Sequence, residues 1–163
     1  KNYKLSMKTT DYLSLDTKAT KKVCDELQSL LVDFQLYYTN LRGFHWNVVG
    51  QQFYRLHNEF EELYDEASDQ IDEIAERILM LGETPKHNFS DYLKANKVKE
   101  SGVVTDGKEA VKHVLDYLKV LIAKEREIVE LAGDAGDEVT VGLMVGYLEG
   151  QEKTVWMLTA YLS

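Results

Sequence analysis

The sequence predicts an all-α protein, a bundle of four long helices with a short extra helix in one long crossover, as a single domain over residues 1–163. Three observations carry this prediction. Apolar residues recur at spacings of three and four along four stretches, which is the period of one helix face. No stretch alternates apolar and polar residues as a strand would. A single proline and 44% hydrophobic residues suit a helical globular core.

The first long helix is expected from Asp16 or Thr17 to about Arg42. Gly43 is expected to lie near its end, where a left-handed cap residue is common. Segment 44–46, Phe-His-Trp, would then fall in the last turn or just beyond it. The predicted inner face consists of Val23, Leu27, Leu30, Phe34, Tyr38 and Leu41.

The second long helix is expected to begin after Gly50 and to end at Gly82 and Pro85, two residues that terminate helices. The connection over residues 87–107 has room for a short helix over residues 88–94. A crossover of this length lets the third helix start far from the end of the second, which favours a bundle over a series of hairpins.

The third long helix should open at Asp106, which has capping-box spacing to Glu109, and should end near Gly133. An acidic loop over residues 134–138 leads into the fourth helix. Before the first helix, residues 1–15 are expected to form an arm, since the segment is polar and shows no helical period. The predicted inner face of the fourth helix consists of Val139, Leu143, Tyr147, Leu148, Val155, Leu158 and Leu162.

Charge and composition exclude several functional classes. A net charge of −9 and a pI near 4.9 argue against nucleic-acid binding through the bulk surface, because phosphate contacts need clustered basic residues. No apolar run reaches the roughly 20 residues of a membrane span, so no membrane partner is expected. Residues 1–14 lack the apolar core of a signal peptide, which predicts a cytoplasmic protein. Cys24 is the single cysteine, so no intrachain disulfide can form.

The second helix carries most of the charge, and two pairs of possible metal ligands. Nine acids and two bases over residues 51–81 give −7 of the formal −9. His57 and Glu61 are four residues apart, as are Asp72 and Glu76, so each pair shares one helix face. Fifteen residues of helix turn the second pair only about 60° from the first but place it about 22 Å further along the axis. One ion cannot join them, so one chain holds two half-sites.

Antiparallel packing of this helix against a copy of itself would complete two identical sites, since a two-fold interface is self-complementary. His45 could join the His57 half. Two imidazoles with two or three carboxylates suit iron, manganese or zinc. Other readings of these residues remain open: a solvated acidic face, a simple His57–Glu61 pair, or His45 stacked beside Trp46.

A long motif resembles one family. The segment from His45 to Tyr64, HWNVVGQQFYRLHNEFEELY, followed by DEIAER from Asp72 to Arg77, closely resembles the Dps family, the mini-ferritins of the ferritin-like superfamily. The closing EKTVWML at residues 152–158 resembles the end of that family's last helix. The likeness covers nearly the whole chain and implies a ferritin-like four-helix bundle.

The resemblance implies a homo-dodecamer assembled from two-fold dimers, with a ferroxidase site at each dimer interface. It implies that the protein oxidises Fe(II), with hydrogen peroxide as the preferred oxidant over O2, and stores Fe(III) mineral in a hollow shell, which protects DNA from oxidative damage. Zinc or manganese can replace iron there. The implied iron ligands are His45, His57 and Glu61 from one subunit and Asp72 and Glu76 from its partner; Trp46 is implied as an accessory residue that takes up stray oxidising equivalents or packs beside the site.

Two departures from the family pattern matter. Many members place an Asp in their three-fold iron pores where this chain has Gly142, so Asp134, Asp137 or Glu138 would line the pores instead. DNA-binding members often carry a longer basic tail, whereas this chain offers three lysines in its first eight residues, so we expect weak DNA binding. The alternatives are a DNA-condensing, nucleoid-associated protein with secondary iron chemistry, and a metal-free helical assembly protein.

Overall fold

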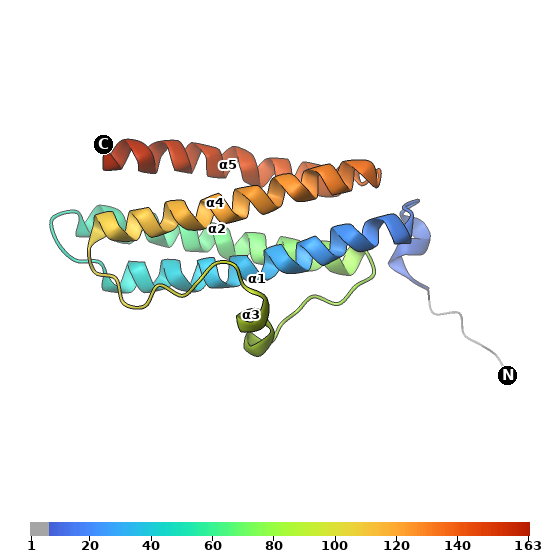
Figure 1. Cartoon of the computed structure of the whole chain (residues 1–163), viewed down its shortest axis with the longest axis horizontal. Helices are drawn as coiled ribbons and strands as arrows, with labels where there is room; N and C mark the ends of the chain where they lie inside the picture. The colour runs from blue at the N-terminus through green and yellow to red at the C-terminus, as the bar shows by residue number, and fades with distance from the viewer. Residues whose placement is uncertain (1–6) are drawn as a thin grey trace.

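The computed structural model describes residues 7–163, and within that range every regular element is a helix (Figure 1). This confirms the predicted four-helix bundle with a short helix in the crossover. Lys1 and Lys4 of the predicted arm lie outside the described residues. The elements are the 3-10 turn η1 (Thr9–Tyr12), the long helices α1 (Thr17–Asn47), α2 (Phe53–Met80), α4 (Gly107–Asp134) and α5 (Glu138–Leu162), and the short helix α3 (Phe89–Ala95).

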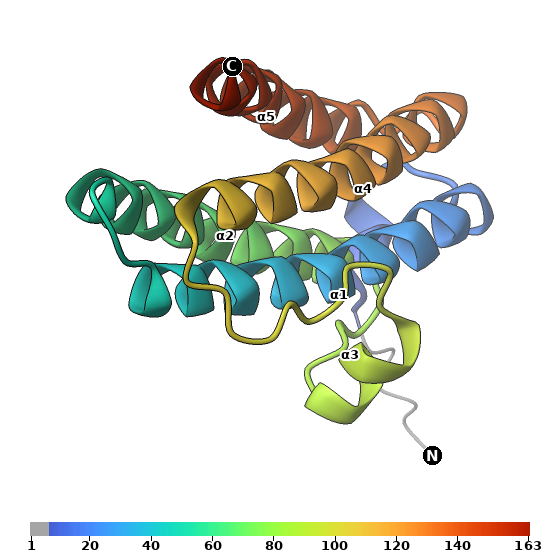
Figure 2. The ribbon, with the colours of Figure 1, turned by 60° about the vertical axis from the view of Figure 1, so that its left-hand side comes forward.

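The helices do not pack equally. Helix α1 packs against both α2 and α4, whereas α5 packs mainly against α4 and forms one edge of the bundle (Figures 1 and 2). Large apolar side chains from facing helices fill the centre, and the biggest of them, Phe34, Phe44 and Phe60, are completely enclosed. Within residues 7–163 no helix has the length and apolarity that crossing a bilayer requires.

The first helix is longer than expected: the predicted end at about Arg42, with Gly43 as a left-handed cap residue, was wrong, whereas residues 44–46 do lie in the last turn. Helix α1 continues through Gly43 to Asn47, and the chain reverses only at Gly50, whose φ of +102° suits glycine. The physical reason is burial: Phe44 and His45 are both enclosed, so their packing holds the last turn helical. The turn also gains a hydrogen bond from Asn47 Nδ2 to the Gly43 carbonyl, 2.8 Å.

Polar residues of α1 hold the crossover in place. Asp33 is fully buried, and its Oδ1 accepts hydrogen bonds from the backbone N–H groups of Lys97 and Val98, at 2.6 and 2.9 Å. Two helical turns further along α1, Asn40 Nδ2 donates a hydrogen bond to the Lys99 carbonyl oxygen at 2.8 Å. The crossover therefore lies along α1, as Figure 2 shows, and delivers the chain to Asp106, whose side chain caps α4 as predicted.

The inner face predicted for the fourth helix was partly wrong. Val139 is 64% exposed, while Met144, which the spacing did not select, is fully buried. Helix α5 carries apolar residues on more than one side, including the exposed Val145 and Trp156, so its sequence does not mark a single buried stripe.

Candidate metal centre

The candidate centre begins with two histidines that bind each other's backbone. His45 stands in the last turn of α1 and His57 early in α2, on either side of the connecting turn. His45 Nδ1 lies 2.7 Å from the His57 carbonyl oxygen, and His57 Nδ1 lies 2.8 Å from the His45 carbonyl oxygen. The two rings are stacked with centroids 3.7 Å apart. Each histidine therefore fixes the orientation of the other.

These reciprocal bonds decide which ring nitrogens can bind a metal. A carbonyl oxygen only accepts, so each Nδ1 must carry the hydrogen and donate it. In the neutral ring, Nε2 then keeps its lone pair, which is the form that a metal needs. Both imidazoles are thus held in the ligating tautomer by main-chain groups of the opposite helix.

Glu61 completes a three-residue group. It lies one turn after His57 on the same face of α2, and one ligand atom from each of His45, His57 and Glu61 falls within 4.8 Å of the others. In the described part of the chain no other set of three metal-binding side chains comes this close. Tyr64 contacts His45 edge-on at 5.3 Å, and partial burial, followed by the charge of Glu61, raises the pKa of its hydroxyl.

Asp72 and Glu76 do not join this group within one chain. Helix α2 is unbroken from Phe53 to Met80, so its rise keeps Asp72 about 22 Å along the axis from His57. Both carboxylates are exposed, and Glu76 borders a shallow hollow between α2 and α5. A single chain therefore presents three side chains that could hold a metal ion at one end of α2 and two exposed carboxylates at the other.

Trp46 lies beside the centre and is 63% exposed. The Arg42 guanidinium sits 4.7 Å from the Trp46 ring and 5.3 Å from the Tyr38 ring, a cation–π arrangement that holds the three side chains together. Tyr38 in turn meets Tyr64 edge-on at 6.0 Å. Trp46 is therefore fixed by Arg42 and does not stack on His45.

The three acids predicted to line a pore have different surroundings. Asp134 and Glu138 are exposed, but Asp137 is only 1% exposed. Its Oδ1 accepts from Arg77 Nη2 at 2.7 Å and its Oδ2 accepts from Thr140 Oγ1 at 2.6 Å. Asp137 is thus engaged inside the subunit, and the prediction that it is available to a pore needs correction. Pore candidates reduce to Asp134 and Glu138.

Sequence reasoning missed the structural role of Arg77. The sequence shows Arg77 as one of the two bases of the acidic helix and as the last residue of the DEIAER motif, yet the structure buries it between α2 and α5. A signal was present, because residue 77 falls three positions after the buried Ile74 and thus on the enclosed side of α2. Because arginine is charged, the apolar pattern of α2 did not include residue 77 in the buried face.

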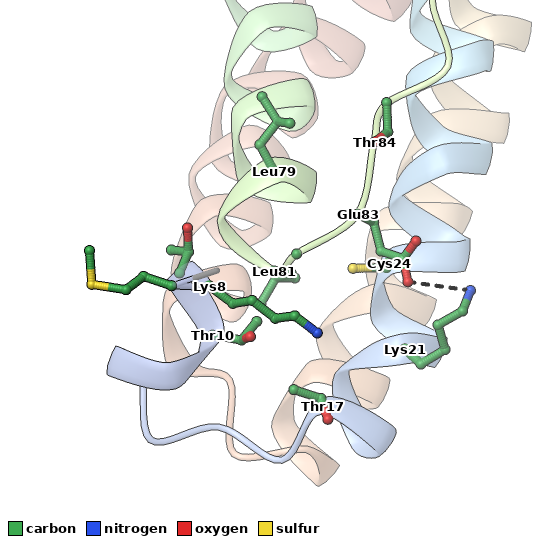
Figure 3. Close-up of a pocket in the computed structure, with 12 residues that line it drawn as sticks. Lys8, Thr10, Thr17, Lys21, Cys24, Leu79, Leu81, Glu83 and Thr84 are labelled. Carbon is green, nitrogen blue, oxygen red and sulfur yellow. Dashed lines mark ion pairs between the residues drawn. The ribbon is translucent and has the colours of Figure 1, made fainter. Parts of the chain in front are cut away.

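A separate cavity of about 510 Å³ lies at the opposite end of α2 from the histidines, under the N-terminal segment (Figure 3). Thr10 approaches Gly82 there, Lys21 faces Glu83 at 3.9 Å, and Cys24 forms part of the wall. Burial raises the pKa of the Cys24 thiol to about 11. The thiol is therefore protonated at neutral pH. Among residues 7–163, no group of three close metal-binding side chains lies in this cavity.

Comparisons with known proteins agree with the fold and the motif. A family model of the ferritin-like domain matches residues 24–163. The chain is 50% identical to the DNA protection during starvation protein of Porphyromonas gingivalis, over 94% of this chain and 97% of that protein. It is 35% identical to DNA protection during starvation protein 2 of Bacillus anthracis, over 88% and 98% of the two chains.

Solved structures show the same likeness. A Dps protein from Vibrio cholerae O1, described as a member of a broad superfamily of ferritin-like diiron-carboxylate proteins, matches with a TM-score of 0.92 at 44% identity, over 97% of this chain and 99% of that one. Dps from Bacillus brevis matches with a TM-score of 0.87 at 34% identity, over 91% and 100%.

Proposed function

Because this chain belongs to the Dps family of ferritin-like proteins, we propose that it is a ferroxidase that oxidises Fe(II) at a site shared by two subunits and stores the Fe(III). One observation carries the proposal. His45 and His57 are locked in the ligating tautomer next to Glu61, while the remaining suitable carboxylates lie about 22 Å away on the same helix. The donor set of imidazole and carboxylate suits iron.

In the proposed site, His45 Nε2, His57 Nε2 and the Glu61 carboxylate bind Fe(II) on one side. Asp72 of the partner subunit and Glu76 of the partner subunit supply the other side. Antiparallel pairing of two α2 helices brings these ends together, because the two half-sites lie on the same side of the helix, about 60° apart. The same pairing builds the site twice in each dimer, and such dimers would assemble into the hollow dodecamer.

The chemistry consumes Fe(II) and hydrogen peroxide together. Two Fe(II) ions each give up one electron to one peroxide molecule, and with two protons the products are two Fe(III) ions and two waters. The carboxylates of Glu61 and of the partner's half-site favour Fe(III), since hard anionic oxygens stabilise the higher charge. Removal of both reactants prevents hydroxyl-radical formation, which accounts for DNA protection, the function that the relatives' names state. Zinc or manganese would compete for the same ligands.

A complementation experiment tests the shared site. We would prepare His57→Ala and Asp72→Ala chains, which should each be inactive alone, and then dissociate and reassemble them in a one-to-one mixture. A mixed dimer pairs the intact His57 of one chain with the intact Asp72 of the other, so about a quarter of all sites should be whole and activity should return. Fe(II) oxidation by peroxide is followed by the ferric absorbance.

The matched control is Glu62→Ala, which removes an exposed acid of the same helix outside the proposed ligand set and should leave the rate unchanged. If the mixture stayed as inactive as its parents although mixed dimers had formed, the site would lie within one chain. If His57→Ala alone oxidised iron at the full rate, the centre would be elsewhere.

A DNA-condensing role would require direct binding, and it has its own test. Lys8 is the one arm lysine that the described range includes, and it is exposed. We expect little retardation of DNA by the assembled protein at physiological salt, because the bulk charge repels phosphate. Strong retardation that is lost on removal of residues 1–8 would favour the nucleoid alternative.

A further inference from the structure

A carboxyl group is buried in the middle of the bundle, away from the metal centre. Glu125 of α4 has no exposed surface. Its Oε1 accepts a hydrogen bond of 2.7 Å from Nε2 of Gln151, a buried residue of α5. This contact joins α4 to α5, the helix that packs mainly against α4.

The pair leaves two oxygen atoms without partners. Glu125 Oε2 and Gln151 Oε1 are both enclosed, and neither has a hydrogen-bond donor within residues 7–163. Buried polar atoms are normally paired, because an unpaired one has lost its contact with water and gained nothing in return. An ionised carboxylate in this place would be costly, as would the free amide oxygen beside it.

No cation within residues 7–163 forms an ion pair with Glu125. Arg126 follows it in the sequence, but its guanidinium is exposed and paired with Glu152. The Lys124 ammonium points to Glu26 of α1 and Glu127. Two phenols also lie near Glu125, Tyr37 of α1 and Tyr147 of α5, and their pKa values are raised first by burial and further by nearby carboxylates.

The facing acids of α2 are engaged elsewhere. Glu73 accepts from the Tyr147 hydroxyl at 2.7 Å, and Glu66 accepts from Gln70 Nε2 at 3.4 Å. A metal ion is also a poor candidate for the space, because Glu125 belongs to no group of three close metal-binding side chains in the described residues. A proton is the remaining way to satisfy both oxygens at once.

We propose that Glu125 is protonated and forms a neutral acid–amide pair with Gln151, in which Glu125 Oε2–H donates to Gln151 Oε1, and that loss of this proton weakens the attachment of α5 to α4. One proton thereby gives both unpaired oxygens a partner. The pair becomes a pH-sensitive link within the subunit. Burial supports the same conclusion, because it raises the pKa of the Glu125 carboxyl to about 7, against the lowering effects of the Gln151 hydrogen bond and of Arg126.

The direction of the pH effect follows from this raised pKa. Between the ordinary pKa of 4.5 and about 7, the folded protein holds the proton that the unfolded chain releases. The stabilisation is therefore complete at low pH and is lost as pH rises through about 7, after which the dependence levels off.

The variant Glu125→Gln tests the proposal, because an amide copies the shape and hydrogen bonding of the protonated acid but cannot ionise. The unfolding equilibrium of the wild type relative to this variant should shift toward the unfolded state on the order of 100-fold between pH 5 and pH 8. Denaturant midpoints of the assembled full-length protein, at fixed protein concentration, give this comparison. The control Glu130→Gln changes an exposed acid of the same helix and should follow the wild type.

Hydrogen exchange provides the second readout. Backbone amides of α5 should lose protection between pH 5 and pH 8 in the wild type relative to Glu125→Gln at the same pH. Parallel stability curves for the two proteins across this range would overturn the proposal. A metal test gives a second way to refute it. The proposal would also fail if Mn(II) or Zn(II) stabilised both the wild type and Glu130→Gln at high pH but did not stabilise Glu125→Gln. A metal ion, and not a proton, would then join Glu125 and Gln151.

Discussion

Replacing Asp137 with alanine should be one of the most destabilising single substitutions in this protein. Its carboxylate accepts from Arg77 at 2.7 Å and from the Thr140 backbone N–H at 3.0 Å, and both charged side chains are buried. Removing one partner of a buried ion pair costs about 3–5 kcal/mol, because the other charge is left without water or counter-charge. Loss of the helix cap adds about 1 kcal/mol.

Denaturant unfolding followed by circular dichroism, at one fixed protein concentration, measures the loss. Asp137→Asn keeps an oxygen for the Thr140 N–H but removes the charge and replaces the acceptor of the Thr140 hydroxyl with an NH2 group, so it should lose about half as much. Adding Arg77→Met to Asp137→Ala should restore part of the stability, since no buried charge then remains unpaired. A loss below about 1 kcal/mol for Asp137→Ala, or simple additivity with Arg77→Met, would refute the reasoning.

Two further predictions concern packing and the thiol. A Cβ on Gly107 would clash with a Leu56 methyl, so Gly107→Ala should cost about 1–3 kcal/mol by overpacking. Gly133→Ala, at a helical site with no atom within 4 Å, should instead stabilise by about 0.5–1 kcal/mol; equal effects in thermal melts would contradict both estimates. Since burial raises the pKa of Cys24 from 9.0 to about 11, iodoacetamide at pH 8 should alkylate it roughly 100-fold more slowly in the native than in the urea-unfolded protein. Comparable rates in the two states would show an accessible thiolate.

Helical periodicity was sufficient to predict the architecture and the placement of the two residue pairs on α2. The spacing of His57, Glu61, Asp72 and Glu76 fixes their relative positions once α2 is an unbroken helix, and helix geometry supplies the 22 Å that separates the halves. The assignment of those residues as iron ligands remains a prediction, because it depends on a second subunit.

Features that depend on contacts between helices could not be predicted. The reciprocal bonds of His45 and His57 require the exact return angle of the chain after α1, and the helical state of Gly43 follows from burial of the residues after it. The engagement of Asp137 depends on Arg77, sixty residues earlier in the chain. In each case the conformation or contact depends on a residue distant in the sequence, which a local sequence pattern does not identify.

Because α2 is unbroken, its length fixes the distance between the two half-sites. In the proposed dimer, the length between its two half-sites sets the spacing of both composite centres. One residue inserted between Glu61 and Asp72 would rotate the far half by about 100° and advance it by about 1.5 Å, at both sites simultaneously. Substitutions on the outer face of α2 would leave the distance between the half-sites unchanged, whereas an insertion or deletion would change it. The segment between the half-sites is therefore constrained in length more strictly than in composition.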